Sequence, residues 1–120
     1  MTNSESSLQA ACFKWFRLAY PNYKLLFFAI PNGGSRNVFE AHNLKLQGVL
    51  SGVSDTFLAV PNNHFAGLFI EFKFNKNKLS PNQSAFFDAV LAQKYATATI
   101  YDFDSFRALI SKYLNNDELY

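Results

Sequence analysis

The chain has 120 residues, 49% of them hydrophobic and 17% charged, which allows one domain over residues 1–120 and excludes a disordered chain. The formal net charge is +2, with nine basic and five acidic residues in 1–94 against two and four in 95–120, so a polyanion-binding surface is expected on the body of the domain. A single cysteine excludes a disulfide framework, two isolated histidines exclude zinc-site spacings, and no apolar run is long enough to span a membrane. We therefore expect a soluble cytoplasmic protein.

The first half of the chain predicts a helix, a strand and a shorter helix. Apolar residues recur at helical spacing over residues 4–20, and the Pro-Asn pair that follows ends this pattern. The apolar run over residues 24–30 predicts a buried strand, which a Pro-Asn-Gly-Gly loop closes. Residues 38–47 predict a short helix that ends at a glycine.

The second half predicts three strands and two helices. Residues 54–60 and 68–74 are apolar on both faces, which is typical of strands at the centre of a covered sheet. Residues 80–83 (S-P-N-Q) form a capping box that opens a helix, whose inward residues are expected to be Phe86, Phe87, Val90 and Leu91. A strand over 97–101 and an amphipathic helix over 104–114 complete the order α-β-(α)-β-β-α-β-α, which predicts an α/β fold with a central mixed sheet flanked by helices.

Three ionisable residues fall on one face of the two central strands. With the connecting turn centred near His64, Phe57 is expected opposite Glu71, and Asp55 opposite Lys73. Because side chains alternate along a strand, the two carboxylates and the lysine then share one face and lie roughly 5–8 Å apart. The sequence therefore predicts a charged cluster on a face otherwise made of Phe and Leu.

This cluster has the chemistry of a metal-dependent phosphodiesterase. Burying charge is costly unless the charge is paired or bound to a metal. Two carboxylates, Asp55 and Glu71, with the backbone carbonyl of Phe72 suit Mg²⁺, and Lys73 beside them suits stabilisation of a phosphate transition state. In the alternative, Asp55 caps the end of a strand, and Glu71 and Lys73 form a solvent-facing pair at the rim of the sheet. This alternative does not explain why charged residues stand among apolar neighbours.

The spacing of three motifs resembles the VRR-Nuc family of the PD-(D/E)XK nuclease superfamily. The motifs are G-V-S-D at 52–55, L-F-I-E-F-K at 68–73 and L-S-P-N-Q at 79–83, and the loop P-N-G-G-S-R at 31–36 adds to the likeness. The resemblance implies a restriction-endonuclease-like core and a DNA endonuclease dependent on Mg²⁺ or Mn²⁺. It also implies a junction-resolvase-like action on duplex or branched DNA, in a small protein of bacterial or phage type.

The resemblance assigns roles to residues of this sequence. Asp55 and Glu71 correspond to the metal ligands and Lys73 to the catalytic lysine. Ser54 stands where the superfamily's name has proline, a position at which VRR-Nuc members vary.

Two further site residues have alternatives that stay open. Gln83 matches the helix glutamine that orients the site in the family, but it also completes the capping box with Ser80. Glu5 is the candidate for an acidic residue of the first helix that reaches the metal, but a glutamate in a first turn is also favoured by the helix dipole.

Contacts to the nucleic acid are expected to be mostly to phosphates, because no array for reading base edges is visible. The candidates are the first loop and three lysines: Asn32, Gly33, Gly34, Arg36, Lys45, Lys76 and Lys78. For Lys76 and Lys78 taken singly, an ordinary solvated loop is the better explanation, and the loop over residues 32–36 is the stronger candidate. Symmetric cutting needs two active sites, so by family analogy we expect a homodimer. The competing hypotheses are a non-catalytic nucleic-acid-binding module and a nuclease subunit that needs a partner.

Overall fold

Four short strands form one mixed sheet in the part of the chain that the structure describes. This structure is a computed structural model, and it describes residues 3–31 and 37–120. The strand order is β1 (Phe27–Ala29), β2 (Thr56–Leu58), β3 (Leu68–Phe72) and β4 (Ala96–Ile100). The β1–β2 and β2–β3 pairs are antiparallel, whereas β3 and β4 are parallel and joined through a helix. The predicted mixed sheet and the order of elements are confirmed.

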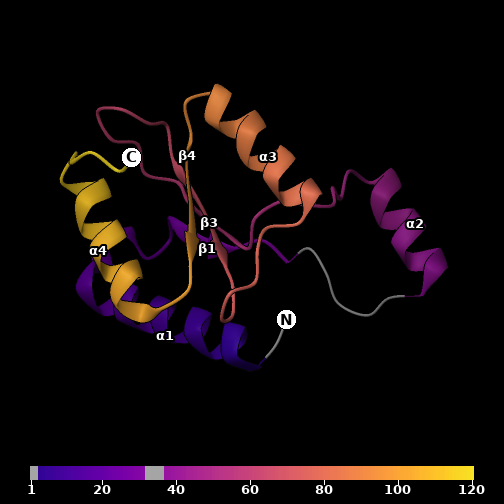
Figure 1. Ribbon diagram of the computed structural model, residues 1–120, viewed down its shortest axis with the longest axis horizontal. Coiled ribbons are helices and arrows are strands. Elements are labelled where there is room, and N and C mark those ends of the chain that lie inside the picture. Colours follow the sequence, from indigo (N-terminus) through magenta and orange to yellow (C-terminus); the bar gives the residue numbers. More distant parts are fainter. Residues whose placement is uncertain (1–2, 32–36) are drawn as a thin grey trace.

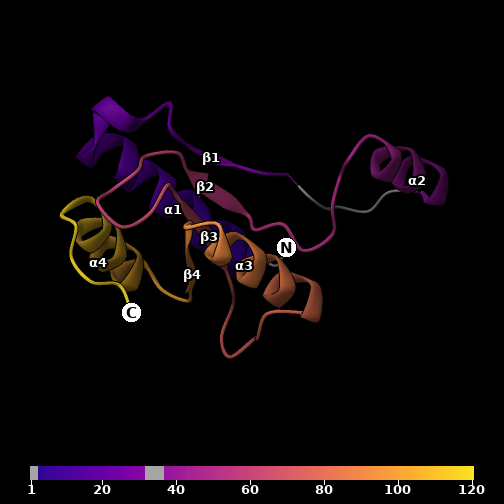
Figure 2. The ribbon, with the colours of Figure 1, turned by 90° about the horizontal axis from the view of Figure 1, so that it is seen from above.

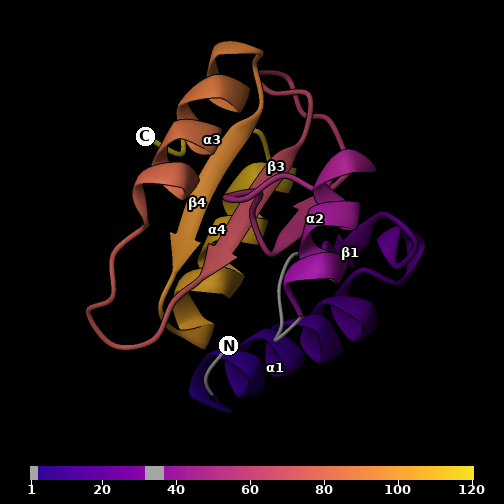
Figure 3. The same cartoon turned by 90° about the vertical axis from the view of Figure 1, so that its right-hand side faces the viewer.

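Helices cover both faces of this sheet. Figure 1 shows α1 (Asn3–Ala19) and α4 (Phe103–Leu114) on one side of β4 and α3 (Pro81–Ala92) on the other. Figure 3, seen from the side of α2 (Val38–Leu46), shows α1 running below the strands. A 3₁₀ helix, η1 (Pro21–Tyr23), follows α1. No helix in the described ranges is long and apolar enough to cross a membrane.

The main core lies between the sheet and the α1–α4 layer, and large rings fill it. Phe16, Phe72, Phe106 and Tyr113 are fully buried there. Burial of one such side chain contributes about 1.5–3 kcal/mol. The Tyr113 hydroxyl is satisfied within the core, because it donates to the carbonyl of Val60 at 2.8 Å. On the opposite face, Phe57 and Phe69 stack beneath α3 and continue the row that leads to the charged residues of β3.

The expectation of a buried strand over residues 24–30 is wrong in two respects. The strand covers only Phe27–Ala29, and it lies at the edge of the sheet, where Phe27 is buried and Phe28 is 44% exposed. Leu25 precedes the strand in a turn and is 84% exposed. An apolar run predicts burial, but an edge strand has only one neighbour, so part of the run stays in contact with solvent.

The register between β2 and β3 differs from the expected one by two residues. Phe57 pairs with Phe69, not with Glu71, so the loop is centred on Asn63 and not on His64. The side chain of Asn62 accepts hydrogen bonds from the backbone N–H groups of His64 and Phe65 and fixes a tight turn there. Because the shift is an even number of residues, every side chain stays on its predicted face. Continuing the register places Asp55 across from Glu71 rather than Lys73.

One helix has no buried residue, and another buries less of its predicted inward face than expected. Residues 38–46 form α2 as predicted, yet none of its residues is buried, and Figures 1 and 2 show it standing apart from the sheet. In α3, Phe87 is buried, but Leu91, expected on the inward face, is 42% exposed.

We predict that Gly52 is required for the approach of the Asp55 segment to α3. Its φ is +96°, and a Cβ built there would lie 2.5 Å from the backbone oxygen of Asn82. Gly48 is the matched control, because its φ is +101° and no atom lies within 4 Å of such a Cβ. Gly48→Ala is expected to cost about 1 kcal/mol and Gly52→Ala about 3 kcal/mol, measured by urea denaturation. Equal losses would contradict a role for close packing.

Candidate active site

Asp55 is held at the start of β2 by backbone contacts to both neighbouring strands. Its carbonyl accepts from the N–H of Ile30 at 2.7 Å, which ties it to the end of β1. Its carboxylate oxygen Oδ2 accepts from the N–H of Phe72 at 2.9 Å. The N–H and C=O of one strand residue point to the same side of the strand, so the Phe72 carbonyl faces the side on which Asp55 lies.

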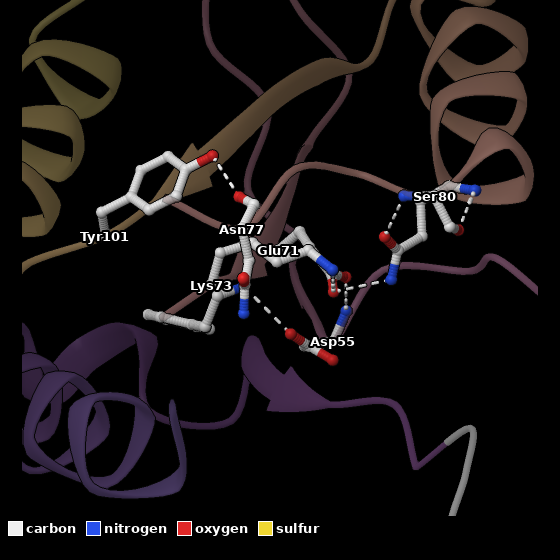
Figure 4. A network of polar contacts seen from close by, with 8 residues as sticks. Asp55, Glu71, Lys73, Asn77, Ser80 and Tyr101 are labelled. Carbon is white, nitrogen blue, oxygen red and sulfur yellow. Dashed lines mark hydrogen bonds and ion pairs between the residues drawn. The ribbon is translucent and has the colours of Figure 1, made fainter. Parts of the chain in front are cut away.

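Glu71 is a charged residue buried in the middle of this arrangement, with 4% of its surface exposed. Its Oε1 accepts from the backbone N–H of Asp55 at 3.1 Å, and its Oε2 accepts from Nε2 of Gln83 at 3.0 Å. Lys73 Nζ lies 3.9 Å from the same Oε2. Figure 4 shows these groups converging from β2, β3 and the start of α3. The predicted clustering of the two acidic residues with the lysine is what the structure contains.

Burial opposes ionisation of both carboxyl groups, and the charge of Asp55 also opposes ionisation of Glu71. Burial is the largest cause of the raised pKa of Asp55, and the nearby charge of Glu5 adds to it, whereas the Phe72 N–H acts in the opposite direction. For Glu71, burial and then the charge of Asp55 raise the pKa to about 8, against a partial lowering by Lys73. Two adjacent carboxyl groups with raised pKa values form a site that a cation would stabilise in its ionised state.

Gln83 both caps α3 and contacts Glu71, so the two roles considered for it are both observed as contacts. Its Oε1 accepts from the backbone N–H of Ser80 at 2.8 Å, and the Ser80 hydroxyl oxygen accepts from the N–H of Gln83 at 3.2 Å, which completes the capping box. Its Nε2 donates a hydrogen bond to Oε2 of Glu71. The side-chain oxygen of Gln83 therefore makes the cap, and its side-chain nitrogen makes the contact with Glu71.

The hydrogen bonds and the ion pair described above do not involve the remaining predicted residues, which are Glu5 and the candidate nucleic-acid contacts. Glu5 lies in the first turn of α1, near enough for its charge to act on Asp55. Lys45 is exposed on α2, and Lys76 and Lys78 are exposed on the loop after β3. Four candidates of the first loop lie outside the described residues: Asn32, Gly33, Gly34 and Arg36.

One contact near the site is not predicted by the sequence. The hydroxyl of Tyr101 donates to the carbonyl of Asn77 at 2.8 Å and fastens the loop that carries the two exposed lysines. In this loop Asn75 adopts a left-handed conformation with φ +57°. The asparagines suggest a turn, but no local signal could link it to a tyrosine 24 residues away.

The donor set fits a hard divalent cation that keeps several waters. Two carboxylates and a backbone carbonyl are all oxygen ligands, as Mg²⁺ and Mn²⁺ prefer. Among the described residues, no group of three or more His, Cys, Asp or Glu side chains is gathered as in a closed metal cage. The residues present therefore suit an open site with few protein ligands.

We predict that the stability of the protein in EDTA falls as the pH rises from about 4.5 to about 8. The pKa of Glu71 is raised from 4.5 to about 8 in the folded state, so across this window the folded state retains a proton that the unfolded state has lost. Glu71→Gln cannot ionise and is expected to flatten the profile by a few kcal/mol, on the order set by a shift of this size. Urea denaturation at several pH values measures it, with the exposed Asp88→Asn as control. An unchanged slope in Glu71→Gln would contradict the assignment.

Comparison with known proteins gives a family and a fold. The model of the VRR-NUC domain matches residues 3–101 of the chain. A solved structure titled "VRR_NUC domain protein" is 19% identical and superposes with a TM-score of 0.82, covering 98% of this chain and 93% of that one. No curated protein matches the sequence. The chain therefore belongs to the VRR-NUC domain family, a family of nuclease domains.

Proposed function

We propose that this protein is a DNA endonuclease that depends on Mg²⁺ or Mn²⁺ and cuts phosphodiester bonds at the Asp55–Glu71–Lys73 site. The observation that carries the proposal is the placement of two carboxyl groups, both with raised pKa values, on adjacent strands with a lysine 3.9 Å from one of them. Buried carboxyl groups this close together destabilise the fold, and a bound cation would offset that cost and could in turn bind a phosphate.

Each residue of the site has a defined part in this chemistry. Asp55, Glu71 and the carbonyl of Phe72 would hold the divalent ion, which supplies Lewis-acid polarisation of the scissile phosphate and acidifies a water. Lys73 has a side chain 14% exposed, so its ammonium group can reach a bound phosphate and stabilise the charge that develops in the transition state. Gln83 fixes the direction of the Glu71 carboxylate.

DNA is the proposed substrate, recognised by shape. The exposed lysines Lys76 and Lys78 lie in the loop after β3, a few residues beyond Glu71 and Lys73. Phosphate contacts of this kind carry no sequence information, which favours duplex or branched DNA, as in a junction resolvase. Lys45 stands farther off on α2 and would contact DNA beyond the cut.

A homodimer is proposed through α2. This helix has no buried residue, and its apolar side chains Val38, Phe39 and Leu46 are 88%, 75% and 74% exposed. A cluster of exposed apolar residues of this kind marks an interaction surface, and a second copy would supply the second active site that symmetric cutting needs.

We predict that Lys73→Ala lowers the cleavage rate by about 10²–10³-fold, because it removes the charge that stabilises the phosphate transition state. The assay uses single strand, duplex, flap, four-way junction and supercoiled plasmid, each with Mg²⁺, Mn²⁺ or EDTA. Lys112→Ala, at an exposed lysine of α4, is the matched control. Metal-dependent cutting that persists in Lys73→Ala would refute the site. Absence of cutting with retained binding would favour a binding module or a subunit lacking its partner.

The two roles of Gln83 can be separated by a pair of variants. Ser80→Ala removes the N-cap oxygen and is expected to cost about 1 kcal/mol of stability while leaving cleavage within a factor of about two. Gln83→Ala also removes the donor to Glu71 and is expected to lower cleavage by about 10–100-fold. Urea denaturation and the initial rate on the best substrate measure the two effects. If both variants lose activity in proportion to stability, the role of Gln83 is capping alone.

We predict that Phe39→Ser with Leu46→Ser converts a dimer into a monomer, as measured by size-exclusion chromatography with light scattering. These side chains are 75% and 74% exposed, so the thermal stability of the protomer should change little. Leu18→Ser is the control, because Leu18 is 76% exposed on α1. A wild-type protein that is monomeric at micromolar concentration would refute this interface.

A further inference from the structure

A groove of about 610 Å³ lies between α1 and the free edge of β1, away from the acidic residues themselves. Its walls come from residues 6–17 of α1 and from 24–29, which include the turn before β1 and β1 itself. The volume lies in the range of sites for small organic ligands. The site chemistry described above makes no use of this groove.

Aromatic rings form the floor of the groove and one of its exposed surfaces. Phe13 and Phe27 stack with their ring centroids 4.2 Å apart and their planes 8° from parallel. Phe28 also lines the groove, and 44% of its surface is exposed. A flat exposed ring beside a rigid aromatic floor suits a planar, aromatic ligand.

The charge of the groove is positive. Arg17 and Lys24 line it, and no acidic side chain does so among the described residues. Neither cation forms an ion pair within the described ranges, and the Arg17 guanidinium lies over the Phe13 ring, with Cζ 5.4 Å from its centroid. The two cations are therefore available for an anionic ligand.

Gln9, which also lines the groove, has a buried side-chain oxygen that lacks a partner. Its Oε1 makes no hydrogen bond in the part of the chain that the structure describes. A buried polar atom left without a partner costs free energy, so a ligand that supplies an N–H donor is favoured here. The base edges of nucleotides carry such donors.

The groove adjoins the candidate active site at one end. Ser6 and Ala29 line that end, and Ser6 follows Glu5, whose charge acts on Asp55. Ala29 pairs with Thr56, the residue after Asp55. From Ser6 to Arg17 the helix rises about 16 Å, so the groove leads from the site to the two cations.

We propose that this groove binds a single-stranded segment of the nucleic acid next to the cut. One unstacked base lies against Phe28 and donates to Gln9, and Arg17 and Lys24 contact the phosphates. The proposal rests on the proposed function, because it extends the strand held at Asp55 and Glu71. It gives the protein a reason to prefer substrates with a single-stranded arm. The charged groups of Arg17 and Lys24 and the Gln9 oxygen lack polar or ionic partners among the described residues, which favours a nucleotide over the exposed apolar side chains of α2 from a second copy.

The test measures binding without cleavage. Fluorescein-labelled ten-nucleotide single strands of DNA and of RNA are titrated with the full chain in EDTA, and fluorescence anisotropy is followed at several salt concentrations. Arg17→Ala is compared with Arg107→Ala, because Arg107 has the same 5.4 Å cation–π geometry on Phe103 but lies outside the groove. Arg17→Ala is expected to weaken binding roughly tenfold and to lower the salt slope by about 0.7, and Arg107→Ala to do neither.

Gln9→Leu and an abasic strand test the pocket for the base. Gln9→Leu is expected to weaken binding roughly fivefold with an unchanged salt slope, and to lose this effect on an abasic strand. Lys24→Ala provides a second charge variant should Arg17→Ala unfold, which circular dichroism reports. The DNA and RNA arms show whether the groove distinguishes the sugar.

Several outcomes would overturn the proposal. Equal effects of Arg17→Ala and Arg107→Ala, or wild-type binding that is as tight for an abasic strand as for an intact one, would refute it. Loss of the dimer in Gln9→Leu or Arg17→Ala, measured by light scattering, would assign the groove to a second copy. Strand binding with these signatures in a protein that cuts nothing would support the groove and refute the proposed function alone.

Discussion

The contact on which the site depends is that between Asp55 and Glu71 across β2 and β3. Two carboxyl groups are brought out of water and close together, where burial raises both pKa values and the charge of Asp55 raises that of Glu71 further. Backbone N–H groups of Asp55 and Phe72, the amide of Gln83 and the ammonium group of Lys73 hold the pair in place. Because most of these donors belong to backbone or to a capped helix, the arrangement is rigid before any ligand binds.

The rest of the fold can be understood as support for this contact. The aromatic core between the sheet and the α1–α4 layer fixes β3 from the far side, since Ile70 and Phe72 are buried there while Glu71 faces α3. The left-handed turn at Gly52 lets the segment before Asp55 approach the start of α3, which carries Gln83. Stability is thus concentrated on one face of the sheet, and chemistry is placed on the other.

The surface features divide according to what they can bind. α2 exposes three large apolar side chains and has no buried residue, which suits the proposed protein partner. The groove beside β1 is aromatic and cationic, which suits the proposed nucleotide. The loop after β3 adds two exposed lysines and is fastened by Tyr101.

The sequence by itself determined the element types, the α/β class and the face on which Asp55, Glu71 and Lys73 lie, because period-two alternation and capping motifs are local properties. It also indicated the family through motif spacing. The tertiary structure decided which residues face each other across the strands and which strand lies at the edge of the sheet. Asn62 sets the turn that places Asp55 opposite Glu71 and not Lys73, and β1 lies at the edge, which exposes Phe28. Pairing register and strand order depend on contacts between residues distant in the chain, and no local pattern encodes them.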